Sequence, residues 1–285
     1  MLYNAALVLE GGAFRGQYTA GVCDTFLAHH IEFKSVIGVS AGSLCGANFV
    51  SKQYGRVTDI NTGYRHNRQY ISLRRLLRQQ NVINLDYLFE DHGLRWTNFD
   101  ERAYVKSASS FSIVATSLAS GKAVVFTDTT GTELENALKA SSSMPFLSEP
   151  QQTSKGLCFD GGIADSIPYD IAQKQGFDKI VVVRTRDVNY RKKPSSAAVR
   201  QMYKRFYPDY PNFIRAGINR PLVYNRQVDA IDELSKAGEL FNLAPQKPVT
   251  ISRLEGNIKK LRALYQEGQQ ETEERLPDLI KYLEK

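Results

Sequence analysis

Residues 35–42 read Ser35-Val-Ile-Gly38-Val-Ser40-Ala-Gly42, a short apolar run that leads directly into the pattern Gly-x-Ser-x-Gly. Such a run predicts a buried strand, and the pattern predicts a nucleophile elbow, the sharp turn by which a strand passes into a helix. Gly38 and Gly42 lack the Cβ atoms that would clash in so tight a turn. We therefore expect Ser40 at the tip of a strand, where its hydroxyl is a candidate nucleophile for acyl transfer.

Strands and helices are expected to alternate on both sides of this elbow. Apolar runs predict the strands, and apolar residues at helical spacing predict the helices. The expected strands cover residues 5–9, 35–39, 111–115, 122–126, 156–159 and 179–183, and the expected helices cover residues 17–30, 41–49, 57–79, 133–140 and 166–175. This alternation predicts an α/β fold with three layers, in which helices cover both faces of a mainly parallel central sheet.

The pattern changes after the last of these strands. Residues 195–243 read as mostly helical, residues 249–251 as a strand, and residues 257–284 as two helices. We expect a catalytic domain over residues 1–187. A mostly helical C-terminal region, basic at first and then acidic, is expected over residues 188–285.

A basic and aromatic stretch lies in this C-terminal region. Residues 190–227 hold nine Lys or Arg and one acid, interleaved with tyrosine and phenylalanine. The stretch suits an anionic membrane surface, where each nearby cation contributes about 1 kcal/mol. The alternative is a solvated helix face whose tyrosines pack inward. No recognition motif for nucleic acid accompanies the charge, so nucleic acid is not an expected partner.

Length and composition limit the class of protein. The chain has 285 residues, 42% of them hydrophobic, which is enough for one large or two modest packed domains. Its net charge is +7. No apolar run reaches the ~18 residues that span a bilayer, and the first residues lack the basic segment of a signal peptide. Cys23, Cys45 and Cys158 form no CxxC pair and are expected to be buried free thiols in a reducing compartment. We expect a cytoplasmic protein, and peripheral contact with a membrane is one of the two interpretations of its basic stretch.

A glycine-rich loop, Glu10-Gly-Gly-Ala-Phe-Arg-Gly16, follows the first expected strand. The N–H groups of such a loop can bind an anion. A Walker P-loop is excluded because no Gly-Lys-Ser/Thr follows. A dinucleotide fingerprint fits poorly because Ala13 replaces its middle glycine and no acid ends the second strand. An oxyanion hole for Ser40 and a tight turn without a ligand remain, and no metal or organic cofactor is expected.

Ser40 needs a base, because a serine hydroxyl alone is a weak nucleophile. An α/β-hydrolase supplies a histidine that follows the serine and the acid in the chain. The last histidine of this chain precedes residue 100, so that order is not available. The four histidines, which we interpret as surface residues, are His29, His30, His66 and His92.

Asp160 is the alternative base. It follows the apolar residues 157–159 and precedes Gly161 and Gly162, so its carboxylate is expected on a tight turn where a strand ends. Open α/β sheets bind their ligands at strand ends. Burial there would make the carboxylate more basic than an exposed one.

Three motifs together resemble the patatin-like phospholipase family in order and spacing. They are the loop at residues 11–16, the elbow at residues 38–42 and the turn at residues 160–162. Residues 141–145 are similar to a small-residue turn of that family. The resemblance extends over about residues 5–185, roughly two thirds of the chain.

The resemblance implies a role for each motif. Ser40 would be the nucleophile and Asp160 the base of a Ser–Asp dyad. The oxyanion loop would comprise Gly11, Gly12, Ala13, Arg15 and Gly16, with N–H groups from the first three and Arg15 helping to fix it. Ala13 departs from the family, where many members have glycine. Backbone N–H donation would survive that change, whereas a loop geometry that requires a positive φ at this residue would not.

We therefore expect a serine acyl hydrolase of the lipid esterase, phospholipase or lysophospholipase type. A fatty-acyl ester or phospholipid is the substrate that the resemblance implies. Two alternatives stay open. One is an acyltransferase that uses the same dyad with an alcohol in place of water, and the other is a non-catalytic regulator that binds an acyl ligand.

Overall fold

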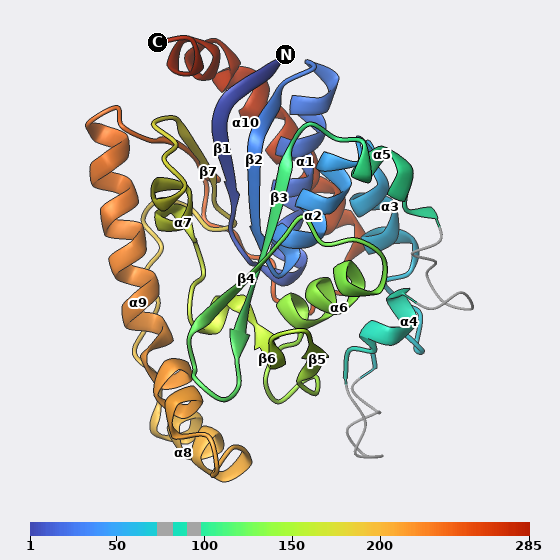
Figure 1. Ribbon diagram of the computed structural model, residues 1–285, viewed down its shortest axis with the longest axis vertical. Coiled ribbons are helices and arrows are strands. Elements are labelled where there is room, and N and C mark those ends of the chain that lie inside the picture. Colours follow the sequence, from blue (N-terminus) through green and yellow to red (C-terminus); the bar gives the residue numbers. More distant parts are fainter. Residues whose placement is uncertain (73–81, 90–97) are drawn as a thin grey trace.

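The computed structural model describes residues 1–72, 82–89 and 98–285 of the chain. An eight-stranded sheet forms its centre, with the order β5-β6-β3-β2-β1-β7-β8 and with β4 paired to β3 (Figure 1). The strands are β1 (Leu2–Leu9), β2 (Glu32–Val39), β3 (Ser110–Ser117), β4 (Ala123–Thr127), β5 (Gln151–Thr153), β6 (Gly156–Asp160), β7 (Ile180–Val183) and β8 (Phe241–Leu243). The helices are α1 (Gly16–Ala28), α2 (Ala41–Val50), α3 (Arg56–Gly63), α4 (Leu85–Phe89), α5 (Glu101–Val105), α6 (Gly131–Ser142), α7 (Tyr169–Lys174), α8 (Ala197–Phe206), α9 (Pro211–Lys236) and α10 (Ile258–Leu283).

The middle of the sheet is parallel. β3, β2, β1, β7 and β8 pair in parallel, whereas β4, β5 and β6 pair antiparallel with their neighbours. Leu7 and Leu9 of β1 belong to the core on one face of the sheet, and Ala6 and Val8 belong to the core on the other. This alternation along a fully buried strand is why helices must cover both faces.

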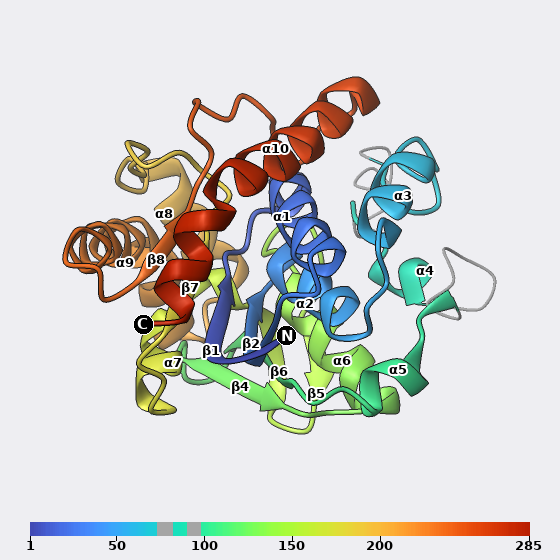
Figure 2. The ribbon, with the colours of Figure 1, turned by 90° about the horizontal axis from the view of Figure 1, so that it is seen from above.

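Helices lie on both sides of the sheet. α1, α2 and α10 cover one face, while α7 and α9 cover the other (Figure 2). The α/β fold with three layers and a mainly parallel sheet is therefore confirmed. None of the helices in the described ranges combines the length and the apolar character needed to cross a membrane. The three cysteines are free and buried.

The C-terminal residues contribute directly to this core. β8 extends the sheet beyond β7, α9 packs against β8, and α10 runs along α1. Tyr18 of α1 donates a hydrogen bond of 2.8 Å to Glu271 of α10. Residues 188–285 therefore complete the same three layers that the first part of the chain begins.

Three details differ from the sequence expectations. Residues 258–283 form a single helix that contains Pro277, because Leu276 and Leu279 on either side of the proline remain buried in the core. The expected strand at residues 249–251 is not one, since β8 occupies the edge position beside β7. The helix expected over residues 57–79 ends at Gly63 and is followed by turns; residues 73–79 lie outside the described part of the chain.

Candidate active site

Ser40 occupies a strained turn between β2 and α2. Its backbone angles are φ 53° and ψ −122°, in a region that non-glycine residues rarely adopt. A Cβ atom at Gly38 would lie 2.5 Å from the Ser43 Cα atom, and one at Gly42 would lie 2.3 Å from the Leu9 carbonyl oxygen. Both glycines are therefore required by close backbone contacts, and neither has a positive φ. Strain of this kind at one residue is typical of functional sites.

Asp160 reaches Ser40 from the opposite direction along the sheet. Val114 of β3 pairs with Val39 of β2, and the next residue, Ala115, pairs with Asp160 of β6. Because β4 occupies the other edge of β3 at both positions, β2 and β6 share one edge and meet tip to tip. Asp160 thus lies at the end of an antiparallel strand. The expectation that open α/β sheets bind ligands at strand ends concerns parallel strands, so it does not explain this position.

The two side chains form a buried hydrogen-bonded pair. Ser40 Oγ donates to Asp160 Oδ2 at 2.7 Å, and Asp160 Oδ1 accepts the Gly162 N–H at 2.8 Å. Ser40 and Asp160 are only 6% and 7% exposed. A carboxylate held in this way can accept the hydroxyl proton and so activate the serine oxygen.

Burial raises the pKa of the Asp160 carboxyl above its ordinary value, because the charged form loses water. The positive charge of Arg220 and the hydrogen bond from Ser40 act in the opposite direction. Arg220 also donates from Nε to the Gly162 carbonyl oxygen. Arg220 therefore stabilises both the negative charge of Asp160 and the turn that follows it.

Ser141 fixes the backbone of the elbow. Its Oγ accepts the Ser40 N–H at 2.8 Å and donates to the Val114 carbonyl oxygen at 2.7 Å. The sequence of residues 141–145 indicates only a small-residue turn. The structure assigns Ser141 the hydrogen bonds that tie the elbow to β3.

The glycine-rich loop lies beside Ser40, as expected from the neighbouring strands. A Cβ atom at Gly11 would lie 3.2 Å from the Ser40 Cβ atom. The Gly11 N–H points to the Ser166 carbonyl oxygen at 3.5 Å, whereas the N–H groups of Gly12 and Ala13 have no acceptor within the described ranges. These two N–H groups are therefore available to an external anion.

Ala13 adopts φ 48°, in the left-handed region that favours glycine. The expectation that a loop geometry with a positive φ would not survive alanine at this position is wrong, and the conformation costs about 1–2 kcal/mol. Gly16 closes the loop at the start of α1, where a Cβ atom would lie 2.8 Å from that of Ala41. Close contact between the starts of α1 and α2 thus constrains the loop around Ala13.

Two cavities meet at Ser40. One is narrow, about 90 Å³, and lined mostly by apolar side chains of α2, α3 and α4, including Leu44, Ile60 and Leu88. The other is wider, about 490 Å³, and contains Asp160 together with several cations. Ser40 and Ala13 line both cavities, so a bound molecule could extend into each from the serine oxygen.

The cations of the wider cavity come from distant parts of the chain. Arg15 belongs to the glycine-rich loop, while Lys192, Arg220 and Arg253 belong to the C-terminal region. Lys192 and Arg220 lie in the basic stretch of residues 190–227, which no pattern in the sequence connects with the site. Arg253 lies in a segment with no distinctive pattern, so no signal in the sequence identified it.

The described histidines lie away from this site. His29 pairs with Glu273 at the surface, and His30 and His66 are exposed. None of these three lines either of the two cavities, and His92 lies outside the described residues. Asp160 is the titratable partner of Ser40 in the part of the chain that the structure describes.

Comparison with known proteins gives matches along most of the chain. The viral protein "Probable lipid hydrolase 463L" of Invertebrate iridescent virus 6 is 26% identical over 238 residues, covering 71% of this chain and 75% of that protein. "Uncharacterized protein YjjU" of Escherichia coli K12 is 33% identical over 184 residues, 63% of this chain and 51% of that protein. The chain thus matches about half the length of this second relative. A solved structure, VipD from Legionella pneumophila, aligns with a TM-score of 0.46 at 12% identity, over 99% of this chain and 67% of that one.

Two family models match separate parts of the sequence. Residues 210–284, which contain α9 and α10, match a domain of unknown function, DUF6363. Residues 7–172, more than half of the chain, match the patatin-like phospholipase model. That range contains the glycine-rich loop, the elbow and the Asp160 turn, and the chain therefore belongs to the patatin-like phospholipase family.

Proposed function

We propose that this protein is a serine acyl hydrolase that cleaves carboxylic esters of lipids. The proposal rests on the 2.7 Å hydrogen bond between Ser40 Oγ and Asp160 Oδ2, made where an apolar pocket meets a cationic cavity. Family membership and the name of the viral relative, a probable lipid hydrolase, support a lipid ester as the substrate.

The proposed reaction has two halves. In the first, Asp160 accepts the Ser40 proton as Oγ attacks the ester carbonyl carbon, and the proton then passes to the alcohol oxygen as its bond to that carbon breaks. In the second, water gives a proton to Asp160 and attacks the acyl-serine, and the proton returns to Ser40 Oγ as the fatty acid leaves. The raised pKa of Asp160 makes its carboxylate a stronger base than an exposed aspartate.

The glycine-rich loop is the proposed oxyanion hole. The N–H groups of Gly12 and Ala13 have no acceptor in the described part of the chain, and the loop contacts the elbow. A preorganised donor of this kind lowers the barrier by about 3 kcal/mol. Because the donors belong to the backbone, alanine at position 13 supplies the same N–H as glycine.

The apolar pocket is the proposed site for the acyl chain. Its lining changes from Ser40 and Ala41 at one end to Val57, Ile60 and Leu88 on α3 and α4. Transfer of an alkyl chain from water to such a lining contributes about 0.8 kcal/mol per methylene group. The alcohol part of the ester would then lie in the wider cavity.

A fluorophosphonate probe tests this assignment, because it phosphonylates only an activated serine. We expect the wild-type protein to be labelled rapidly and Ser40→Ala not to be labelled. Ser43→Ala is the matched control: Ser43 lies one turn along the same elbow, and its Oγ donates to the Ser40 carbonyl oxygen. Equal labelling of the wild type and Ser40→Ala would refute the assignment of Ser40 as the nucleophile.

We also propose that α8 brings the site to an anionic membrane surface. Val199, Met202 and Phe206 are 37%, 39% and 60% exposed at helical spacing, and Val199 and Met202 also line the wider cavity. Exposed Arg200, Lys204 and Arg205 lie on the same helix.

Other aromatic residues of the basic stretch, among them Tyr203 and Phe213, pack inward in a cluster with Phe159. The basic stretch thus contains exposed residues that suit a membrane surface and aromatic residues that pack into the core.

Vesicle binding tests the role of α8. We expect binding to vesicles containing phosphatidylglycerol to exceed binding to phosphatidylcholine vesicles and to weaken as salt screens the cations. Phe206→Ser should weaken it about tenfold, since burying a phenylalanine contributes about 1.5–3 kcal/mol. Val105→Ser on α5, whose side chain is 58% exposed against 60% for Phe206, should leave vesicle binding unchanged. Vesicle binding that changes with neither salt concentration nor lipid charge would contradict the proposal.

A further inference from the structure

The wider cavity beside Ser40 carries a large excess of positive charge. Five cations line it, against one carboxylate, Asp160; the cations are Arg15, Lys192, Lys193, Arg220 and Arg253. Within residues 1–72, 82–89 and 98–285, none of the five forms an ion pair with an Asp or Glu side chain. The Nε atom of Arg15 is buried and has no hydrogen-bond partner in these ranges.

These cations repel one another. The pKa of the Lys192 ammonium is lowered far below its ordinary value by burial and by the charges of Arg220, Arg253 and Arg15. Burial and Arg186 lower the pKa of Arg15 to about 10. Glu10 attracts both groups, and its carboxylate also accepts the Thr185 N–H at 2.6 Å. An anion in the cavity would relieve the remaining repulsion.

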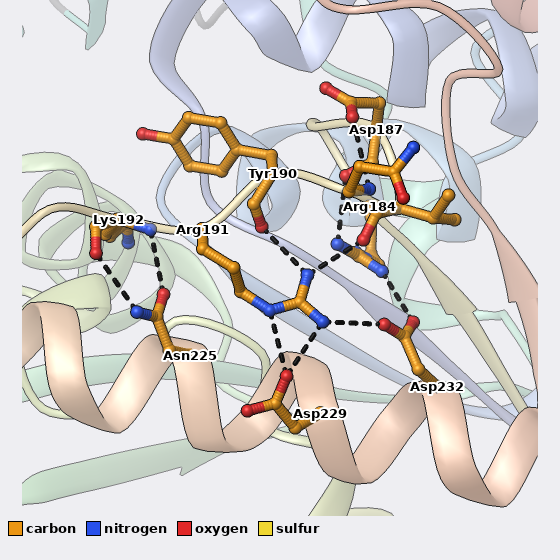
Figure 3. Close-up of polar contacts among 10 residues, drawn as sticks. Arg184, Asp187, Tyr190, Arg191, Lys192, Asn225, Asp229 and Asp232 are labelled. Atoms are coloured by element: carbon orange, nitrogen blue, oxygen red, sulfur yellow. Dashed lines mark hydrogen bonds and ion pairs between the residues drawn. The ribbon is translucent and has the colours of Figure 1, made fainter.

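The segment that carries Lys192 is held rigidly against α9. Arg191 contacts Asp229 at 2.8 Å and Asp232 at 3.0 Å, and the fully buried Arg184 contacts Asp232 at 3.0 Å (Figure 3). The Lys192 backbone makes two hydrogen bonds with the Asn225 side chain, of 2.8 and 3.0 Å. The charge of Arg191 is therefore neutralised by α9, whereas Lys192 lines the cavity and forms no ion pair within the described ranges.

Two further contacts hold the cations in position. Lys192 Nζ lies 3.5 Å from the centre of the Tyr224 ring, which also belongs to α9. Arg220 of α9 donates to the carbonyl oxygen of Gly162, two residues after Asp160. A single helix thus positions the two cations relative to the Ser40–Asp160 pair. Such preorganised cations are typical of phosphate sites, since Arg binds phosphate oxygens in pairs and Lys acts as a point charge.

We propose that this cavity binds a terminal phosphate monoester on the alcohol part of the ester. The inference rests on the acyl hydrolase function proposed above, and it names acylated glycerol phosphates as the preferred substrate class. A phosphate monoester carries close to two negative charges at neutral pH and can engage several of the cations. A choline head group would bring a positive charge among them and be repelled, and a neutral glycerol would leave them unpaired.

Three soluble esters with the same acyl chain test this preference without a membrane. They are 1-octanoylglycerol 3-phosphate, 1-octanoylglycero-3-phosphocholine and 1-octanoylglycerol, each below its micelle concentration. We expect kcat/KM to be at least about tenfold higher for the phosphate monoester, because a charge-assisted hydrogen bond contributes a factor of about ten or more. Equal or better turnover of either other ester would overturn the proposal.

Variants of the cations identify the source of the preference. Lys192→Met should raise KM for the phosphate ester about tenfold, whereas KM for 1-octanoylglycerol, which carries no phosphate for this cation to bind, should rise less than about twofold. Arg226→Met removes an exposed arginine from the same helix α9 that does not line the cavity, and should change neither. An equal loss on all three esters would mean that the cations act only through the fold, and would overturn the proposal.

A binding measurement separates this inference from the hydrolase function. Calorimetry on Ser40→Ala should detect binding of sn-glycerol 3-phosphate, no binding of glycerol, and about tenfold weaker binding after Lys192→Met. This result would support the phosphate site even if no ester were hydrolysed and the fluorophosphonate failed to label Ser40. Inorganic phosphate that binds as tightly as glycerol 3-phosphate, with no preference among the esters, would indicate a free-phosphate site and overturn the substrate assignment. Absence of binding by both phosphates would also overturn it.

Discussion

Replacement of Asp160 by asparagine should lower kcat/KM for ester hydrolysis about 10³-fold, within the range of about 10²–10⁴ that a positioned base contributes. The amide can keep the hydrogen bond from the Gly162 N–H through Oδ1. It then presents an NH2 group to Ser40 Oγ, where the wild type has the acceptor oxygen Oδ2 at 2.7 Å. The serine would keep its place and lose its proton acceptor. Steady-state kinetics with a chromogenic short-chain ester measure the effect.

Comparison with the Ser40 variants and the pH dependence of the wild type both test whether Asp160 acts as the base. Ser40→Ala and the double variant should be no less impaired than Asp160→Asn, and the losses should not add, because the two residues act as one unit. The wild-type kcat/KM should fall as the pH is lowered through the pKa of Asp160, which lies above the ordinary value of about 3.9. Activity of Asp160→Asn within tenfold of the wild type would show that another group removes the proton.

Loss of folding should not account for the inactivity of Asp160→Asn. Burial raises the pKa of Asp160 in the folded state, so the folded protein binds this proton more tightly than the unfolded chain does. The contribution to stability is therefore present at low pH and lost as the pH rises through the folded-state pKa. Asparagine carries no charge at any of these pH values, and the variant should be at least as stable as the wild type at neutral pH.

The elbow and the Asp160 turn could be predicted from the sequence because each is a local structure. Gly38 and Gly42 are required by atoms within a few residues or on the adjacent strand, and the Asp160 carboxylate bonds to an N–H two residues away. The tip-to-tip meeting of β2 and β6 was not predictable in the same way. It depends on β3 extending beyond the end of β2, which is decided by long-range pairing.

Other features required tertiary contacts that outweigh local preferences. Ala13 adopts a positive φ against its own preference, because the loop is enclosed between Ser40 and the contact of Gly16 with Ala41. Pro277 lies inside a helix that the sequence was expected to divide. Arg253 enters the site from more than 200 residues along the chain from Ser40, and no local pattern links the two.

Substitution of Gly268 by alanine should destabilise the fold by about 2 kcal/mol or more, in the range of overpacking costs of about 1–3 kcal/mol. A Cβ atom at Gly268 of α10 would lie 2.3 Å from the Tyr18 carbonyl oxygen of α1, and one at Gly21 of α1 would lie 2.2 Å from the Tyr265 carbonyl oxygen of α10. The two helices therefore cross with their backbones in contact, and a methyl group must push them apart. Helix propensity alone predicts the opposite sign, a gain of about 1 kcal/mol, so the sign of the change in the free energy of unfolding decides between the two effects.

Gly63→Ala, at a helical position with open space around it, should be neutral or slightly stabilising. Gly21→Ala combined with Gly268→Ala should cost less than the sum of the two, because one separation of the helices accommodates both methyl groups. A Gly268→Ala protein as stable as the wild type in urea unfolding would mean that α10 does not pack against α1 in this way.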